Sequence, residues 1–211
     1  MRKGIGITLI LLGVVCLLFA AGMVVHHHLD AKVAKTSAES ILQEAQEMIK
    51  QSVIPTIEKE DYQEIPSEDV SEESPKKIPV VRLQEDNCIG ILSIPVLELE
   101  LPVLDRWNYS KLKKAPCRYF GSCYGTDFVI AAHNYAAHFG RLSELKPGDL
   151  VIFTDATGGV YGYEVILLET LPGTATEAMI TSGFDLSLYT CTPGGANRVT
   201  VRCNRIQENV K

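Results

Sequence analysis

The sequence predicts a mainly β protein, a closed or nearly closed β-barrel with short helices, preceded by a transmembrane helix and a stalk. Three observations support this fold class. Residues 4–25 are uncharged and mostly apolar, residues 54–79 are rich in proline and acidic side chains, and residues 87–206 contain many short apolar or alternating runs separated by turn residues. Because helical patterns are few, a doubly wound sheet is disfavoured. The 211-residue chain is therefore expected to hold one small folded domain behind an anchor.

The N-terminal apolar run is long enough to cross the hydrocarbon core of a bilayer as a helix. Arg2 and Lys3 precede it, and the run is longer than the apolar part of a secretory signal peptide, which favours an uncleaved anchor. Basic residues favour a cytoplasmic location, so residues 1–3 are expected inside the cell. We therefore expect a single-pass protein of the cell membrane whose C-terminal domain is extracellular.

Residues 26–86 are expected to separate the anchor from the folded domain. Helix formers predict a stalk helix over residues 31–51, with a partial apolar stripe that consists of Val33, Ile41, Leu42, Ala45, Met48 and Ile49. The acidic, proline-rich residues 54–79 cannot bury enough apolar surface to offset their ordering entropy, so they are expected to form an extended spacer. Three adjacent histidines, residues 26–28, do not share a helix face, which favours a solvated patch over a metal site.

The charge distribution excludes one class of partner. The net charge of −6 comes mostly from the acidic spacer, because residues 87–211 contain 11 Lys and Arg against 12 Asp and Glu. The sequence has no basic stripe, so it does not predict nucleic-acid binding. The acidic balance gives no information about a substrate.

The folded domain is expected to span residues 87–206, followed by a short tail at 207–211. Residues 89–95 and 96–103 alternate in polarity and are predicted to be paired strands broken by proline. Further strands are predicted at residues 127–132, 149–154, 160–170, 186–191 and 198–206, with short helical segments at residues 109–114 and 139–145.

Three side chains of this domain suggest nucleophilic chemistry. Cys191 ends a predicted strand and Arg198 begins the next one after a turn, which places a thiol beside a guanidinium. Arg202 shares a strand face with Arg198, but Arg198 is preferred because it lies level with Cys191. A useful thiol nucleophile also needs a base. His133 is preferred to His138 for this role because it directly follows a buried strand.

These residues resemble the sortase family of Gram-positive cell-surface cysteine transpeptidases. The resemblance covers residues 87–206 and implies an eight-stranded β-barrel with the cysteine, histidine and arginine on one face. Ser187 replaces the first threonine of the family's Thr-Leu-x-Thr-Cys signature, and Ala132 replaces the glycine that many members have before the histidine. Class B-like and class D-like members therefore both remain open. The resemblance rests on Leu188-Tyr189-Thr190-Cys191-Thr192, on Arg198, on Ala132-His133-Asn134, and on the first strand, Ile89-Gly90-Ile91-Leu92-Ser93-Ile94-Pro95.

The resemblance implies an acyl transfer through a thioester. Cys191 would attack the threonine carbonyl of an LPxTG-like or NPxTx-like sorting motif in a surface protein, and an amine of a peptidoglycan precursor or a pilin would complete the transfer. His133 would serve as general acid and then as base, and Arg198 would stabilise the oxyanion. Thr190 is expected to orient the arginine or the substrate. The enzyme would be a thiol hydrolase by class, with hydrolysis as a slow side reaction.

The segment at residues 171–183 is predicted to recognise the substrate. Its Ala178, Met179 and Ile180 are expected to line a groove for an apolar residue of the sorting motif, although an ordinary crossover connection is an equal alternative. No cofactor is expected, and the sequence does not reveal whether calcium modulates the loops.

The other cysteines suggest structural roles. Cys16 lies in the anchor, and Cys88 and Cys203 lie in or near predicted strands. Cys117 and Cys123 predict either an extracellular disulfide or two buried thiols. With a histidine they match no common zinc-ligand spacing, so no metal site is expected.

Two alternative functions predict different features. A papain-like peptidase has its cysteine before its histidine and at the start of a helix, and an L,D-transpeptidase has a Ser-x-Gly-Cys-type motif. Here His133 comes first and Cys191 ends a strand. A non-catalytic anchored barrel that binds surface partners would instead bury Cys191 in an unreactive position.

Overall fold

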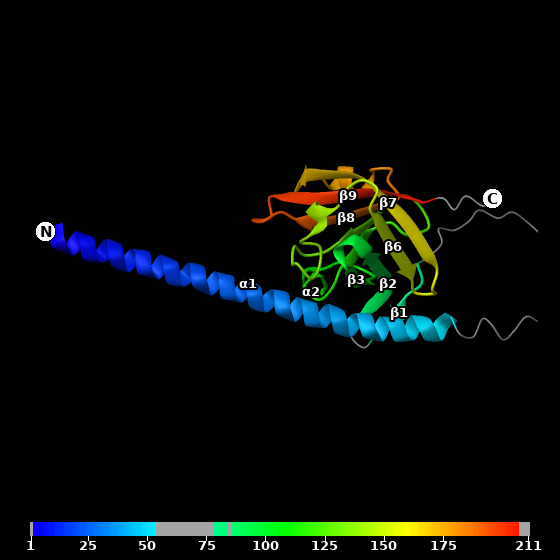
Figure 1. Cartoon of the computed structure of the whole chain (residues 1–211), viewed down its shortest axis with the longest axis horizontal. Coiled ribbons are helices and arrows are strands. Elements are labelled where there is room, and N and C mark those ends of the chain that lie inside the picture. Colours follow the sequence, from blue (N-terminus) through cyan, green and yellow to red (C-terminus); the bar gives the residue numbers. More distant parts are fainter. Residues whose placement is uncertain (1, 54–77, 84–85, 207–211) are drawn as a thin grey trace, which may run out of the picture.

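The computed structural model describes residues 2–53, 78–83 and 86–206 of the chain. A long helix, α1 (Arg2–Val53), leads to a β-barrel, and its N-terminal end projects away from that barrel (Figure 1). Most of the predicted acidic spacer and the tail at residues 207–211 lie outside the described residues, so those two expectations stay predictions.

The barrel consists of short strands joined by tight turns and small helices. Its elements in chain order are β1 (Val81–Arg82), β2 (Asn87–Ile94), the 3₁₀ turn η2 (Pro95–Leu97), β3 (Leu99–Leu104), α2 (Tyr109–Leu112), β4 (Cys117–Phe120), β5 (Phe128–Ala131), the 3₁₀ turn η3 (Leu142–Glu144), β6 (Leu150–Asp155), β7 (Val160–Pro172), α3 (Thr176–Ile180), β8 (Leu186–Cys191) and β9 (Asn197–Arg205).

The sheet closes on itself through β2. The strand order is β1-β2-β3-β4-β5-β8-β9-β7-β6, and β2 also pairs with β6, so β2 to β9 form a closed eight-stranded barrel flanked by the two-residue β1. Gly90 lies at the closure, where an added Cβ would meet the carbonyl oxygen of Thr154 at 2.1 Å. Only glycine permits so close an approach of two strands. The predicted mainly β barrel is confirmed.

Most predicted strands occur close to their expected positions. The second predicted strand starts at Leu99 because residues 95–97 form a 3₁₀ turn that ends at Glu98 in a left-handed conformation, with φ of 52°. The sequence did not predict β1 or β4. β4 has four residues between Pro116 and Gly121, too few for alternation to stand out.

Apolar side chains from every part of the barrel fill its interior. Ile89, Leu92, Ile130 and Leu186 are fully buried in one cluster, and Tyr163 joins them from β7. Since successive strand residues point to opposite faces, the remaining strand positions face solvent or carry functional groups at the barrel ends.

The second half of α1 packs against the barrel beside β1, β2 and β3 (Figure 1). Its buried face consists mainly of alanines: Ala34, Ala38 and Ala45 are at most 3% exposed, and Ile49 follows on the same face. Val33, part of the predicted stripe, is instead 65% exposed. The predicted stalk helix is therefore present, but it is docked onto the folded domain through small side chains.

The first half of α1 has no protein partner among the described residues. Its large apolar side chains from Leu11 to Val25 are mostly exposed, and the helix is long and apolar enough to cross a membrane.

Candidate active site

The ends of three neighbouring strands bring the predicted catalytic residues together. β8 lies between β5 and β9, and Cys191 pairs directly with Arg198. On the other side of β8, the backbone N–H of Ala132 donates to the carbonyl of Tyr189 at 3.2 Å, so His133 leaves β5 beside the cysteine end of β8. Cys191, His133 and Arg198 all line one cavity of about 170 Å³.

Thr190 does not face this cavity. Its side chain is 4% exposed, and its hydroxyl donates to the carbonyl of Ala132 at 2.9 Å. The hydroxyl therefore connects β8 to the residue just before His133, which links the position of Cys191 to that of the histidine.

Replacing Thr190 with valine should loosen this link. Valine has a similar shape but cannot donate, so the buried carbonyl of Ala132 loses its side-chain partner, at a cost of about 1–3 kcal/mol in the free energy of unfolding. We expect peptide cleavage to fall roughly tenfold as well. Thr181→Val is a matched control, because the Thr181 hydroxyl also donates to a backbone carbonyl, at 2.8 Å, but is exposed. Denaturant unfolding and initial rates measure both effects; equal effects in the two variants would contradict this role.

His133 has a nitrogen available for proton transfer. The side chain is half-buried, and its Nε2 is buried without a hydrogen-bond partner among the described residues. Burial lowers the pKa of His133, Lys113 lowers it further, and Asp30 on α1 opposes the shift. The imidazole is therefore mainly neutral at pH 7 and able to accept a proton.

His138, the competing histidine, is fully buried away from the cavity. Burial lowers its pKa to about 4, an effect that the backbone of Ala34 opposes in part. It therefore belongs to the packing of the loop that carries His133.

The buried state of His138 should make the protein acid-sensitive. Its pKa is about 4 in the folded chain against an ordinary 6.5, so its neutral form is favoured by folding, and this contribution to stability is complete above pH 6.5 and lost as the pH falls toward 4. We expect a loss on the order of 3 kcal/mol over that window. His138→Phe, which cannot protonate, should unfold with a flatter pH dependence in denaturant melts. An unchanged pH dependence would show that His138 is not the titrating group.

The turn between β8 and β9 fixes the guanidinium of Arg198. Its Nη1 donates to the carbonyls of Gly195 at 2.8 Å and Asn197 at 3.0 Å. Thr192 braces the turn, because its hydroxyl accepts from the backbone N–H of Asn197 at 3.1 Å. The Nε and Nη2 donors have no acceptor among the described residues, which leaves them available to a substrate oxygen.

Arg202 has a different environment and a structural role. It is 2% exposed, donates to the carboxylate of Glu169 at 2.7 Å and the hydroxyl of Ser187 at 2.8 Å, and also reaches the carbonyl of Ala178 at 2.7 Å. All three nitrogens of its guanidinium donate hydrogen bonds, and two of them reach backbone carbonyls of α3. The serine at the unusual signature position, Ser187, is one of its buried acceptors.

The predicted recognition segment contains the short helix α3, and only part of it reaches the cavity. Met179 lines the cavity, whereas Ala178 and Ile180 do not belong to its described lining. Arg202 holds the carbonyl of Ala178, which fixes α3 to the barrel. Pro172 and Gly173 add backbone to the same wall.

An aromatic wall on the other side of the cavity was not predicted from the sequence. Trp107 lies 5.6 Å from Tyr119 between ring centroids, Tyr119 lies 5.4 Å from Tyr189, and Tyr109 packs against the edge of Trp107 at 5.7 Å. Trp107 is 40% exposed and Tyr109 is 76% exposed. Exposed aromatic rings at a cavity provide apolar contact area for a ligand. The one available signal was the closely spaced Trp107 and Tyr109.

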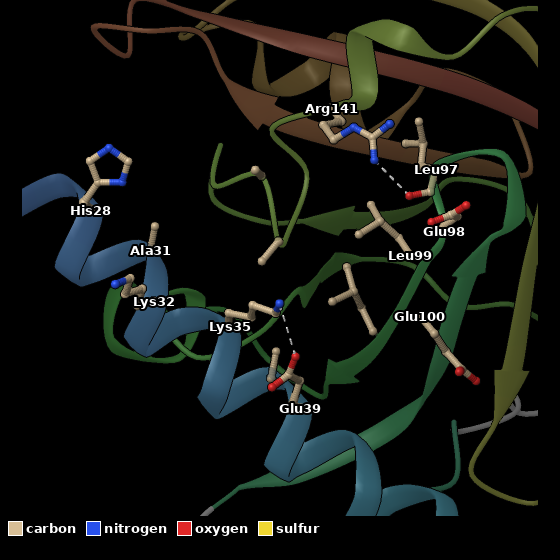
Figure 2. Close-up of a pocket in the computed structure, with 14 residues that line it drawn as sticks. His28, Ala31, Lys32, Lys35, Glu39, Leu97, Glu98, Leu99, Glu100 and Arg141 are labelled. Atoms are coloured by element: carbon tan, nitrogen blue, oxygen red, sulfur yellow. Dashed lines mark hydrogen bonds and ion pairs between the residues drawn. The ribbon is translucent and has the colours of Figure 1, made fainter.

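A larger cleft lies elsewhere, between α1 and the start of β3 (Figure 2). Its volume is about 550 Å³, and Figure 2 shows Lys35 paired with Glu39 on the helix side and Arg141 donating to the carbonyl of Leu97 on the barrel side. None of its described lining residues is a cysteine. The cleft is therefore separate from the cavity that Cys191, His133 and Arg198 line, although it borders Ala136 and Ala137 of the His133 loop.

Cys191 differs from the other barrel cysteines in exposure. All six cysteines fall within the described residues and all are free thiols, but within the barrel only Cys191 is partly exposed. Burial raises the pKa of Cys88 to about 11 and that of Cys203 to about 12, so these thiols are poor nucleophiles. Cys117 and Cys123 are two buried thiols, and the described residues contain no cluster suited to a metal ion.

Comparison with known proteins identifies the family. Residues 92–206, more than half of the chain, match the model of the sortase domain. The chain therefore belongs to the sortase family of cell-wall transpeptidases. No protein with a curated description matches the sequence.

Solved structures with the same fold come from two sortase classes. Sortase C1 from Streptococcus suis is 29% identical over 58% of this chain and 75% of its own, with a TM-score of 0.51. Sortase C1 from Streptococcus agalactiae is 25% identical over 58% and 69%, also with a TM-score of 0.51. The sortase D5 transpeptidase of Clostridium perfringens is 16% identical over 83% and 99%, with a TM-score of 0.56, and shares the fold.

Proposed function

We propose that this chain is a membrane-anchored transpeptidase that cleaves a sorting motif after its threonine and transfers the acyl group to an amine. The observation that carries the proposal is the shared cavity of Cys191, His133 and Arg198, in which the histidine has an unpartnered buried nitrogen and the arginine has free donors. A non-catalytic barrel would not need a partly exposed thiol beside these two groups.

In the first half-reaction, a peptide bond is exchanged for a thioester. The sulfur of Cys191 attacks the threonine carbonyl while neutral His133 accepts the thiol proton. Arg198 donates to the carbonyl oxygen as it gains negative charge, a role suited to a fixed planar cation. The C–N bond then breaks, and His133 gives its proton to the departing amine.

In the second half-reaction, an amine of a peptidoglycan precursor or a pilin replaces the departed fragment. His133, neutral again, accepts a proton from the incoming amine as it attacks the thioester. The carbon–sulfur bond breaks, and Cys191 regains a proton. Water gives hydrolysis by the same route, and we expect it to be slower because the reaction favours the better amine nucleophile.

The cavity walls favour an extended apolar segment of the sorting motif. Trp107 and Tyr109 offer exposed rings on one side, and Met179 offers a flexible apolar side chain on the other. Of the three loop residues expected to contact substrate, we retain Met179, since Ala178 and Ile180 are not among the residues that line the cavity. LPxTG-like and NPxTx-like motifs both contain the apolar or proline residues that such walls accept.

The location that we propose follows from the N-terminal half of α1. Its exposed apolar side chains need a bilayer to cover them, and Arg2 and Lys3 favour the cytoplasmic side. The barrel would then lie outside the cell, close to the membrane surface, among surface proteins and cell-wall precursors.

A peptide panel tests the function. The full chain in detergent micelles is incubated with fluorogenic peptides that contain LPxTG-like or NPxTx-like motifs, with the same residues in scrambled order as controls. We expect cleavage after threonine in one motif class and none in the scrambled peptides. If both motif classes are left intact while an added amine is present, the proposal is wrong.

A further inference from the structure

The loop that carries His133 is compact and tightly bonded. In this histidine loop, residues 132–140, the backbone N–H of Phe139 donates to the carbonyl of His133 at 3.1 Å, and the N–H groups of His138 and Gly140 both donate to the carbonyl of Tyr135 at 2.9 Å. An added Cβ on Gly140 would lie 2.6 Å from the carbonyl oxygen of Asn134. A displacement of one part of the loop therefore moves His133 as well.

A row of packed rings connects His133 to α1. The ring centroids of His133 and Tyr135 are 5.1 Å apart, and those of Tyr135 and His138 are 5.8 Å apart. His138 is fully buried, and the backbone of Ala34 lies beside it. Neither ring nitrogen of His138 has a hydrogen-bond partner among the described residues. Its position is thus set by packing against the helix.

The helix side of this contact is built from small side chains. Ala34 is 1% exposed and Ala38 is 3% exposed, and Ala38 belongs to the same buried cluster as Phe139 of the histidine loop. Nearby, the cleft of about 550 Å³ separates α1 from the start of β3 (Figure 2). Ala34 and Ala38 are therefore the residues through which this part of α1 packs against the histidine loop.

We propose that residues 30–38 of α1 position the catalytic histidine, acting through Ala34, His138 and Tyr135 on the histidine loop. The inference rests on the proposed function, because it assigns a role in that same reaction. The segment that follows the predicted membrane span then has two roles: it connects the barrel to the membrane, and it holds the histidine loop in place. Docking of α1 sets the activity of the barrel.

A leucine at Ala34 tests the contact. The buried position has no room for the larger side chain, so Ala34→Leu should push α1 away from the histidine loop. Val33→Leu is the matched control, because Val33 is the neighbouring residue on the same helix and is 65% exposed. Both full-length variants are compared with the wild type in detergent micelles by hydrogen exchange and by peptide cleavage.

The exchange measurement does not depend on activity. We expect the backbone amides of residues 133–140 to exchange at least tenfold faster in Ala34→Leu and at the wild-type rate in Val33→Leu, while the amides of β8 and β9 keep their protection. Unchanged exchange in the histidine loop would overturn the proposal. If Ala34→Leu does not fold, His138→Ala replaces it, because it removes the imidazole that packs against α1. We expect the same faster exchange in His138→Ala, and unchanged exchange there would overturn the proposal.

The kinetic measurement separates positioning from general damage. For Ala34→Leu we expect kcat to fall at least tenfold with KM changed less than twofold, because the aromatic wall and Met179 remain in place. A wild-type kcat in a variant with a loosened loop would overturn the proposal. If the wild type itself cleaves no peptide, the proposed function fails, and the exchange result alone decides whether α1 holds the loop.

The pH profile adds a signature that a merely structural contact would not give. Loosening the loop exposes His133 to solvent, so the acid limb of the kcat/KM profile should move upward toward pH 6.5 in Ala34→Leu and stay in place in Val33→Leu. An acid limb that does not move would contradict the role. The titratable or charged groups around His133 are Asp30 from α1, Lys113 from the β3–β4 connection, Tyr135 and His138 from its own loop, and Cys191 and Arg198 across the cavity.

Discussion

Cys191→Ala is expected to abolish cleavage of sorting-motif peptides, with a loss of at least about 10³-fold in kcat. Alanine removes the sulfur that would form the proposed thioester, and the described lining of the cavity holds no second thiol, because the other barrel cysteines are buried. The substitution should leave the free energy of unfolding nearly unchanged, since Cys191 is partly exposed.

The matched control for this variant is Cys16→Ala. Cys16 is exposed on the N-terminal half of α1, far along the chain from the barrel, and its replacement should leave the cleavage rate at the wild-type value. Residual cleavage by Cys191→Ala at more than a few per cent of the wild-type rate would require a different nucleophile.

Arg198→Lys should lose roughly 10²–10³-fold in kcat/KM although the charge is kept. The guanidinium is held by the carbonyls of Gly195 and Asn197 through one nitrogen, while its other donors have no acceptor among the described residues. An ammonium group is a point donor and cannot satisfy the turn and the oxyanion together. Initial rates over a range of peptide concentrations give the loss.

Arg106→Lys provides the comparison for this substitution. Arg106 is exposed and does not line the catalytic cavity, so the same chemical change there should leave kcat/KM within twofold of wild type. Equal rates for Arg198→Lys and the wild type would remove the arginine from the mechanism.

The sequence predicted those parts of the molecule that depend on local pattern. Strands with clear alternation or continuous apolar runs, such as residues 186–191, occur where expected, and a cysteine at a strand end followed by a turn and an arginine indicated one end of the barrel. His133 was selected in a similar way, because it lies directly after a buried strand whose position in the barrel is fixed. Strand pairing then brings the three residues to one cavity.

Other features depend on contacts that no local pattern shows. The docked face of α1 consists mainly of alanines, which have little hydrophobic signal. The partial stripe therefore included the buried Ala45 and Ile49, but it missed Ala34 and included the exposed Val33. Trp107 and Tyr109 reach the cavity only because β3 and β4 pair as parallel strands around α2. The preference for Arg198 over Arg202 stays a prediction, and the burial of Arg202 against Ser187 and Glu169 is visible only in three dimensions.

Intact-mass spectrometry of the acyl-enzyme tests the central claim most directly. The full chain is mixed with the sorting-motif peptide that it cleaves, without an added amine, and quenched in acid within one turnover. We predict an added mass equal to the peptide fragment that ends at threonine, located on the peptide containing Cys191 and removed by hydroxylamine. Cleavage after threonine with no adduct on Cys191 at any quench time, or an adduct that persists in Cys191→Ala, would contradict the account.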